Sequence, residues 1–157
     1  MNLDEVNAYI HKQIPLTSAL AVTVASYDSQ SVKLDVPLTP NLNHRDTAFG
    51  GSLAAVGILA GWSLLFIKFK EMNLSARLVI QKSQFDFTAP VDSDFHAICS
   101  LPDDKHWQLF LNTFQRRGRA RITLRSQIEF AGNDGGKHEG VYVAVRLQTA
   151  EQDSIIK

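Results

Sequence analysis

The feature that most constrains this chain is a long stretch without charge. From Thr47 to Ile67 no residue carries a charged side chain, and the stretch includes four glycines: Gly50, Gly51, Gly57 and Gly61. A polar cluster, Asn43 to Asp46, lies directly upstream. A polar loop that opens onto an apolar helix leaves the first helical amides without intrahelical partners, at the positive end of the helix dipole. Such a helix start can receive a developing negative oxygen, so we interpret it as an active or binding site.

Three alternatives remain open for this stretch. It is long enough to cross a bilayer, and Gly57 and Gly61 have the GxxxG spacing of membrane helix dimers. It can also be a buried core helix without chemistry, in which the same glycines let a sheet or a ligand approach closely. In the third alternative its N-terminus binds a ligand without converting it. Because the rest of the chain has the pattern of half-buried strands, we expect no membrane span.

The whole chain limits the class of protein. Its 157 residues correspond to one domain, covering 1–157, and the formal net charge is zero. A balanced charge gives no reason to expect a nucleic-acid partner. The single cysteine, Cys99, excludes an intramolecular disulfide and favours a reducing compartment, and the N-terminal acids Asp4 and Glu5 do not suit a secretory signal. We therefore expect a cytoplasmic protein.

The segments before the central helix predict one helix and two strands. Leu3, Val6, Ile10 and Ile14 have helical spacing, and Pro15 ends this helix. Residues 18–27 and 31–38 have strand character and a short polar link, which predicts a hairpin.

The segments after it predict four strands and one helix. Strands are expected at 77–88, 93–100, 119–130 and 139–148, and aromatic residues with helical spacing predict a helix over 102–118. Residues 131–136 have the composition of a loop, and we expect Val141, Val143, Val145 and Leu147 to point inward. Polar residues at Gln81, Ser83 and Gln84 interrupt the first of these strands. The interruption indicates either the lip of a ligand site or an exposed strand face.

The sum of these elements predicts an α+β fold: a twisted antiparallel sheet of about six strands wrapped around one long apolar helix. Such a sheet has edges that a second copy of the chain can cover. We expect a homodimer or a dimer of dimers.

At this point the residues resemble a known family. The order of elements resembles the hotdog fold, in which a long helix is enclosed by the sheet. The strings NLNHRDTAFGGSLAAVGILAGW and RRGRARI resemble the thioesterase family named for the YiiD C-terminal domain, and the resemblance extends from Val6 to Leu147. In that family the domain stands alone or follows a GNAT-type acetyltransferase domain.

The resemblance implies roles for the loop and the helix start. Wider hotdog thioesterases often carry an Asn six residues before a His that precedes Gly-Gly; here Asn43 matches and Phe49 replaces the histidine. Asn43 would orient water or the thioester, and the amide of Gly50 or Gly51 would polarise the carbonyl. We expect Asn43, Asp46 and Gly51 to be catalytic. The expected substrate contacts nearby are His44, Phe49, Gly50 and Ser52.

One departure from the family concerns the attacking group. Related enzymes often have an acid about two turns past the first glycine, where this chain has Ile58. Asp46 is then the nearest candidate base, followed by His44 and by Asp86 of this or a neighbouring subunit. The plain alternatives are a turn or cap role for Asp46 and a solvated loop position for His44. Ser63 has no recognisable His–Asp partners, which argues against it as a serine nucleophile.

The remaining expectations concern the substrate. Arg117 and Arg119 belong to an arginine cluster suited to the phosphates of coenzyme A or of an acyl-carrier protein, and the alternative is a helix end followed by a solvated strand face. No zinc-site spacing occurs, and we expect no metal and no cofactor beyond coenzyme A as part of the substrate. Two function classes remain: hydrolysis of acyl-CoA or acyl-carrier-protein thioesters, and non-catalytic binding of acyl-CoA or fatty acyl groups beside an acyltransferase.

Overall fold

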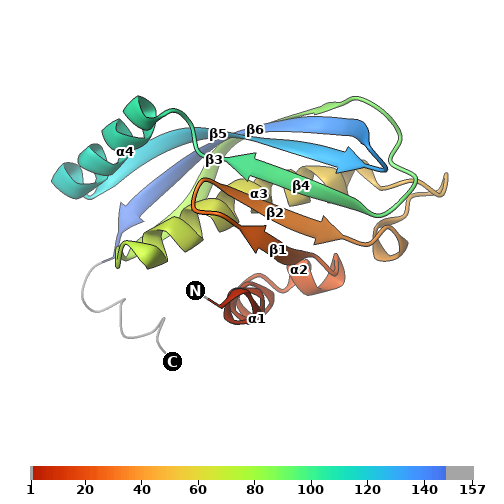
Figure 1. Ribbon diagram of the computed structural model, residues 1–157, viewed down its shortest axis with the longest axis horizontal. Coiled ribbons are helices and arrows are strands. Elements are labelled where there is room, and N and C mark those ends of the chain that lie inside the picture. Colours follow the sequence, from red (N-terminus) through yellow and green to blue (C-terminus); the bar gives the residue numbers. More distant parts are fainter. Residues whose placement is uncertain (1, 148–157) are drawn as a thin grey trace.

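The computed structural model describes residues 2–147 (Figure 1). Its elements in chain order are α1 (Leu3–Gln13), α2 (Leu16–Ala19), β1 (Thr23–Tyr27), β2 (Ser31–Val36), a short 3-10 helix (Thr39–Asn41), α3 (Gly50–Glu71), β3 (Ala76–Phe87), β4 (Phe95–Ser100), α4 (Asp104–Arg117), β5 (Arg119–Phe130) and β6 (Asn133–Arg146).

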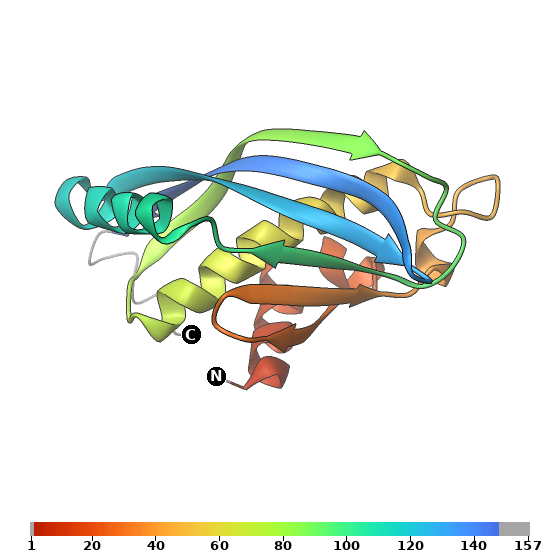
Figure 2. The ribbon, with the colours of Figure 1, turned by 45° about the horizontal axis from the view of Figure 1, so that its top comes forward.

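The six strands form one antiparallel sheet in the order β1-β2-β4-β5-β6-β3. The sheet curves around α3, which runs along its inner face (Figure 2). β1 and β3 are the edge strands. The predicted α+β architecture, with six strands around one apolar helix, is confirmed.

The glycines of α3 let the sheet lie against the helix backbone. A Cβ added at Gly57 would come within 2.6 Å of the His138 Cβ, and one added at Gly61 would overlap the Tyr142 hydroxyl. The Tyr142 hydroxyl donates a hydrogen bond to the Ile58 carbonyl over 2.7 Å, and the Ser126 hydroxyl donates to the Gly57 carbonyl over 3.0 Å. The two glycines therefore serve close approach of the sheet.

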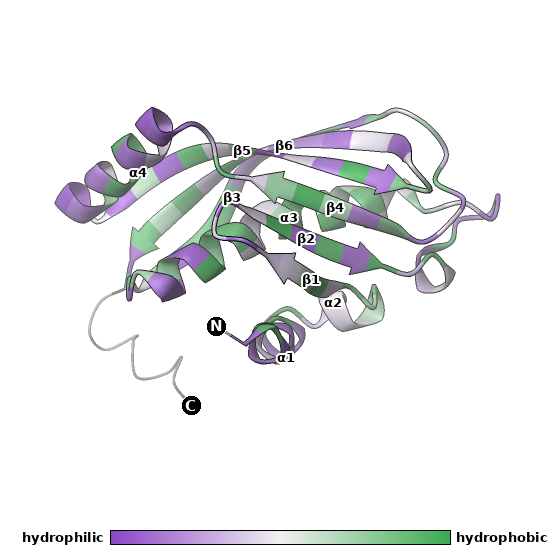
Figure 3. Cartoon of the chain, viewed as in Figure 1, coloured by the Kyte–Doolittle hydropathy of each residue, from purple (hydrophilic) through white to green (hydrophobic). Residues whose placement is uncertain are grey.

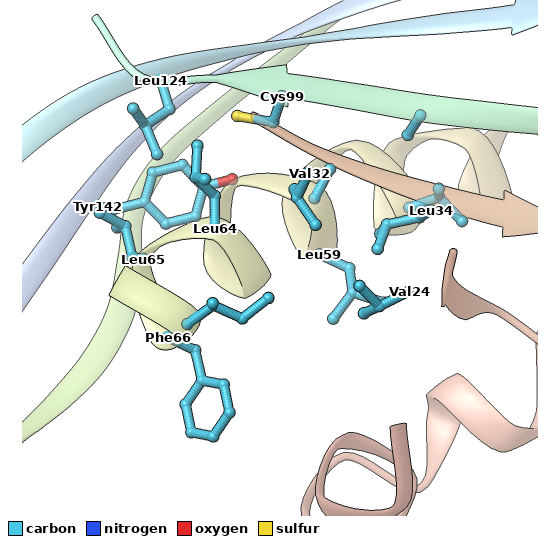
Figure 4. Close-up of a cluster of buried hydrophobic side chains, with 14 of the residues drawn as sticks. Val24, Val32, Leu34, Leu59, Leu64, Leu65, Phe66, Cys99, Leu124 and Tyr142 are labelled. Atoms are coloured by element: carbon cyan, nitrogen blue, oxygen red, sulfur yellow. The ribbon is translucent and has the colours of Figure 1, made fainter. Parts of the chain in front are cut away.

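The core lies between α3 and the sheet. Figure 4 shows Tyr142 and Leu124 on one side of α3 and Val32 and Leu34 on another, with Leu64 among them. By length and composition α3 could cross a membrane, but most of it is buried in this fold. Figure 3 shows the alternation of polar and apolar residues along the strands.

Helix α4 packs against the C-terminal end of α3. Phe110 and Phe114 of α4 pack against Phe69, with ring centroids 5.9 and 5.1 Å apart. The Asp103 side chain caps the first turn, and Gly118 ends the helix with φ +69°, a left-handed conformation that favours glycine. β4 pairs with residues 125–129 of β5 and not with its first half, beside which α4 lies.

The structure differs from the sequence prediction in two segments, before β1 and between β5 and β6. Residues 16–19 form a short helix and β1 begins at Thr23, so the strand predicted over 18–27 was too long. The loop predicted at 131–136 was also wrong, because Asn133 already pairs with Phe130 and the turn is two residues, Ala131 and Gly132. Both have positive φ, 47° and 78°, as tight hairpin turns require.

The predicted facing of β6 was wrong as well. Tyr142 and His138 point to α3, so alternation places Val141, Val143 and Val145 on the outer face of the sheet. The interruption predicted in β3 corresponds to a β-bulge between Ile80 and Lys82. After this bulge Ser83, Phe85 and Phe87 share the inner face.

Candidate active site

A closed loop leads into α3. Leu42 and Ala48, on the two sides of this loop, form an antiparallel β-bridge, and the Asn43 amide donates a hydrogen bond to the Thr47 carbonyl over 2.8 Å. The Phe49 amide then donates to the Asn41 carbonyl over 2.7 Å, which sets the direction in which the helix begins. The loop is therefore fixed at both of its ends.

The side chain of Asn43 holds this loop together. Its Oδ1 accepts hydrogen bonds from the amides of Arg45 (2.8 Å) and Thr47 (3.2 Å). Its Nδ2 donates to Thr47 Oγ1 over 2.9 Å. This is the local bonding by which Asn stabilises turns. The structure thus gives Asn43 a bracing function in the loop.

The start of α3 presents unpaired backbone donors. Among the described residues the amides of Gly50, Gly51 and Ser52 have no hydrogen-bond partner, and the Phe49 side chain provides no cap. The amides lie at the positive end of a helix of 22 residues. Gly51 is exposed, Gly50 is half-buried and Ser52 is buried. An anionic oxygen at this point would find several donors directed toward it.

Two exposed aromatic rings flank these amides. Phe49 is 57% exposed and Phe87, at the end of β3, is 59% exposed. A Cβ at Gly51 would overlap the Phe49 ring, and one at Gly50 would lie 3.2 Å from the Phe87 ring. Phe85 continues the apolar surface, with its ring centroid 4.5 Å from that of Phe87. The first turn of α3 is therefore bordered by apolar surface that is open to a ligand.

The candidate bases lie in different places. His44 and Asp46 are exposed in the loop, and Asp46 has φ +59°, a conformation that Asp tolerates better than most residues. Asp86 pairs with Lys137 on the outer face of β3, opposite to Phe87, and lines an outer hollow of about 400 Å³. Within one chain Asp86 therefore faces away from the helix start.

Arg117 and Arg119 lie at the other end of the molecule. They line a hollow of about 710 Å³ between α4 and β5, together with Arg121 and Leu109. Arg119 pairs with Val145 of β6, whereas Phe87 pairs with Gly136, and these two points on β6 are about 30 Å apart. Within one chain the arginines and the start of α3 do not meet.

The structure brings together one polar pair that the sequence analysis did not identify. Ser83 Oγ on β3 lies 2.8 Å from His138 Nε2 on β6. His138 is 1% exposed, and burial lowers its pKa below the ordinary 6.5, although Glu139 raises it in part. The polar interruption of β3 was the available signal, but the partner lies 55 positions away. Ser63 is buried, and its hydroxyl has no partner among residues 2–147.

The described part of the chain, residues 2–147, contains no group of three His, Cys, Asp or Glu side chains that could hold a metal ion. The Cys99 thiol is buried, and burial raises its pKa to about 12. It therefore remains a protonated thiol at neutral pH.

Comparison with solved structures gives the same fold. A protein of unknown function from Chlorobaculum tepidum TLS is 29% identical, with a TM-score of 0.85 over 92% of this chain and 94% of that chain. A "putative thioesterase" from Shewanella oneidensis is 24% identical, with a TM-score of 0.82 over 91% and 96%. A "probable thioesterase" from Pseudomonas aeruginosa is 17% identical, with a TM-score of 0.80 over 94% and 97%.

The long helix enclosed by a single antiparallel sheet defines a domain of the hotdog fold. The chain belongs to the family described as "Putative thioesterase (yiiD_Cterm)", whose model matches residues 3–146. The resemblance noted in the sequence is thereby confirmed.

Proposed function

We propose that this protein hydrolyses acyl thioesters of coenzyme A or of an acyl-carrier protein. The observation that supports this most is the start of α3, where the amides of Gly50, Gly51 and Ser52 have no partner among the described residues. A thioester carbonyl placed there would receive hydrogen bonds that strengthen as its oxygen becomes negative. Preorganised donors of this kind lower the barrier of acyl transfer.

The surroundings suit such a substrate. The exposed rings of Phe49 and Phe87 offer apolar surface beside the donors, to an acyl chain or a pantetheine arm. His44 and Ser52 belong to the same loop and first turn. In this proposal Arg117 and Arg119 bind the phosphates of the carrier. Because they lie far from the start of α3 within one chain, they would bind a substrate whose thioester is held by another copy. Coenzyme A takes part as a portion of the substrate.

The proposal includes a second copy of the chain. β3 is an edge strand of 12 residues, and its Val79 and Phe87 are 43% and 59% exposed. Such an edge presents unpaired backbone groups to another strand. We propose a homodimer, or a dimer of dimers, in the cytoplasm.

The attacking water needs a base. Asp46 is the carboxylate nearest to α3 in the upstream loop, and its assignment as a base is a prediction that Asp46→Asn tests. Water activation by a positioned carboxylate contributes about 10²- to 10⁴-fold. Loss of release with retained substrate binding would support the assignment.

A second function is supported by a specific feature of the helix. No acid occurs between Thr47 and Ile67. Related enzymes often carry one at the position of Ile58, whose carbonyl accepts a hydrogen bond from the Tyr142 hydroxyl. The Asn43 polar atoms are already engaged in their own loop. A domain that binds acyl-CoA or fatty acyl groups without converting them, beside an acyltransferase, would also show these features.

Thiol release from a panel of short, long and aromatic acyl-CoA and acyl-carrier-protein thioesters separates the two functions. Turnover by the native protein that falls in Gly51→Pro supports hydrolysis. If no thioester is cleaved and acyl-CoA raises the melting temperature, the binding function replaces it, because a ligand of the folded state stabilises that state.

A further inference from the structure

A serine and a histidine from two neighbouring strands meet on the inner face of the sheet. Ser83 Oγ and His138 Nε2 are 2.8 Å apart, which is the distance of a nucleophile from its base. Ser83 is exposed on the edge strand β3, and His138 is buried on β6. One member of the pair can therefore reach a substrate while the other is shielded from water.

The histidine is held rigidly and has an unused ring nitrogen. Its Cβ packs against Gly57 of α3, where a methyl group would come within 2.6 Å. Its buried Nδ1 has no hydrogen-bond partner in the described part of the chain. Buried polar atoms are seldom left unpaired where they have no function.

The surroundings of His138 keep its imidazole neutral. Burial is the largest influence and lowers the pKa, and Glu139, the charged neighbour on the same strand, opposes it. The facing groups on β3 and β5, Ser83 and Ser126, carry no charge. A neutral imidazole with its proton on Nδ1 accepts a proton at Nε2, the atom that faces Ser83.

We propose that Ser83 is the nucleophile of thioester cleavage and that His138 is its general base, an inference that rests on the proposed function. The pair lies beside Gly57, two turns into a helix that carries no acid up to Ile67. It supplies at that level an attacking oxygen and a proton acceptor. With this pair, neither an acid on α3 nor Asp46 as the base is required, and His138 replaces Asp46 in that role.

The reaction proceeds in two balanced steps. Ser83 Oγ attacks the carbonyl carbon while its proton passes to His138 Nε2; the C–S bond breaks, and the leaving thiolate takes that proton as a thiol. Water then attacks the acyl-serine ester and gives a proton to Nε2. The ester C–O bond breaks, a carboxylic acid is released, and Ser83 recovers its proton. The nucleophile is thus regenerated without any other reactant.

The donors for the carbonyl oxygen lie elsewhere in the same chain. Gly50 and Gly57 are about 10 Å apart along α3, and Ser83 and Phe87 are about 13 Å apart along β3. One copy therefore does not place its own first-turn amides beside its own Ser83. The pair and the amides of one copy do not complete a site alone.

A second copy paired through β3 completes it. In an antiparallel pair related by a two-fold axis at Phe85, Ser83 of one copy lies directly opposite Phe87 of the other, about 5 Å away. Phe87 touches Gly50 of its own helix, so the first-turn amides arrive beside the Ser83–His138 pair. Each dimer then contains two sites, and each site draws on both copies.

Covalent labelling tests the nucleophile directly. We would treat native protein with a fluorophosphonate, in which Ser83 Oγ displaces fluoride, and locate the adduct by mass spectrometry. We expect one adduct at Ser83, none in Ser83→Ala, and at least a hundredfold slower labelling in His138→Gln. Ser100→Ala, a change of another exposed strand serine, serves as the control and should label normally. Because Ser83 is exposed, Ser83→Ala should fold; circular dichroism checks each variant.

Thiol release and subunit mixing complete the test. Ser83→Ala should lose at least a hundredfold in thiol release. When Ser83→Ala and Gly51→Pro are mixed in equal amounts, half of the dimers contain one copy of each variant, and one of the two sites in each mixed dimer is intact. The mixture should therefore recover about a quarter of native activity. If no adduct forms at Ser83, or if Ser83→Ala releases thiol at the native rate, the assignment of Ser83 as nucleophile and His138 as base is wrong. This holds even if the native protein is a hydrolase. If the native protein cleaves no thioester, the proposed function fails, while a Ser83 adduct that depends on His138 still supports the pair.

Discussion

Gly57 of α3 and His138 of β6 are in such close contact that the helix residue has no room for a side chain. The added methyl carbon would lie 2.6 Å from the His138 Cβ and 3.0 Å from its Cγ. Both partners are buried, and the Gly57 carbonyl is also tied to β5 through Ser126. This contact fixes the distance between the central helix and the sheet.

Replacing Gly57 by alanine should therefore destabilise the protein. Alanine gains about 1 kcal/mol in helix propensity over glycine, but overpacking a core contact costs about 1–3 kcal/mol, and here backbone elements must separate. We expect a net loss in the free energy of unfolding, measured by urea denaturation. Gly50→Ala is the control, because its new methyl meets the exposed ring of Phe87, which can turn away. Equal stabilities of the two variants would contradict the contact.

The stability of the protein should fall in mild acid because of His138. Its pKa is lower in the folded state than the ordinary 6.5 of an unfolded chain, owing mainly to burial. The unfolded state then binds more protons below pH 6.5, so stability is fully present above that pH and is lost as the pH falls toward the folded pKa. Each extra proton that the unfolded state binds lowers the free energy of unfolding by about 1.4 kcal/mol per pH unit of acidification.

Urea denaturation between pH 8 and pH 5 measures this loss. His138→Gln should show a smaller dependence of the unfolding free energy on pH than the native protein. The same slope in native protein and in His138→Gln would show that His138 is not responsible.

Removing one backbone donor at the start of α3 should abolish most thioester cleavage. Proline at Gly51 lacks the amide proton and is tolerated in a first helical turn, where that proton has no helical partner. Loss of one such donor typically costs 10²- to 10³-fold in turnover. Gly51→Ala keeps the amide and introduces the same Cβ against the Phe49 ring, so it is the matched control. Thiol release distinguishes them, and equal rates would exclude the Gly51 amide.

Asn43 should act through the loop that it braces. Asn43→Ala loses the bonds to Thr47 and to the Arg45 amide, and we expect a cost of about 1–3 kcal/mol in unfolding free energy. Asn43→Asp keeps the Oδ1 acceptor and should recover part of that stability. If activity follows stability in the two variants, Asn43 supports the loop. If Asn43→Asp is as stable as the native protein but inactive, the side chain acts on the substrate.

The architecture could be predicted because the sequence patterns are local. The uncharged stretch, the strict alternation of β5 and the cap signals of α4 each specify an element from adjacent residues. The hairpin turn was missed because Ala131 adopts a positive φ that glycine and asparagine usually supply. The facing of β6 was missed because glycine and histidine occupy its inner face, while valines cover the outer one.

The candidate site was less predictable because it combines distant segments. The helix start follows from the sequence, since the loop and the first turn are contiguous. The proximity of Phe87 to Gly50 and of Ser83 to His138 depends on pairing between β3 and β6, which are about 50 residues apart in the sequence. The bulge in β3 also changes which polar residues point inward, and the local sequence pattern does not predict this bulge.

The position of β6 between β5 and β3 has a consequence for synthesis of the chain. The residues that cover Gly57 and Gly61 lie on β6, which follows the other strands of residues 2–147 in the chain and leaves the ribosome about 70 residues after the helix that it covers. Until then α3 exposes an uncharged face of membrane-spanning length, and β3 has no neighbour to pair with. A nascent chain that ends before Asn133 therefore offers its most apolar helix to chaperones and lipid surfaces, and completion of the β5–β6 hairpin ends that exposure.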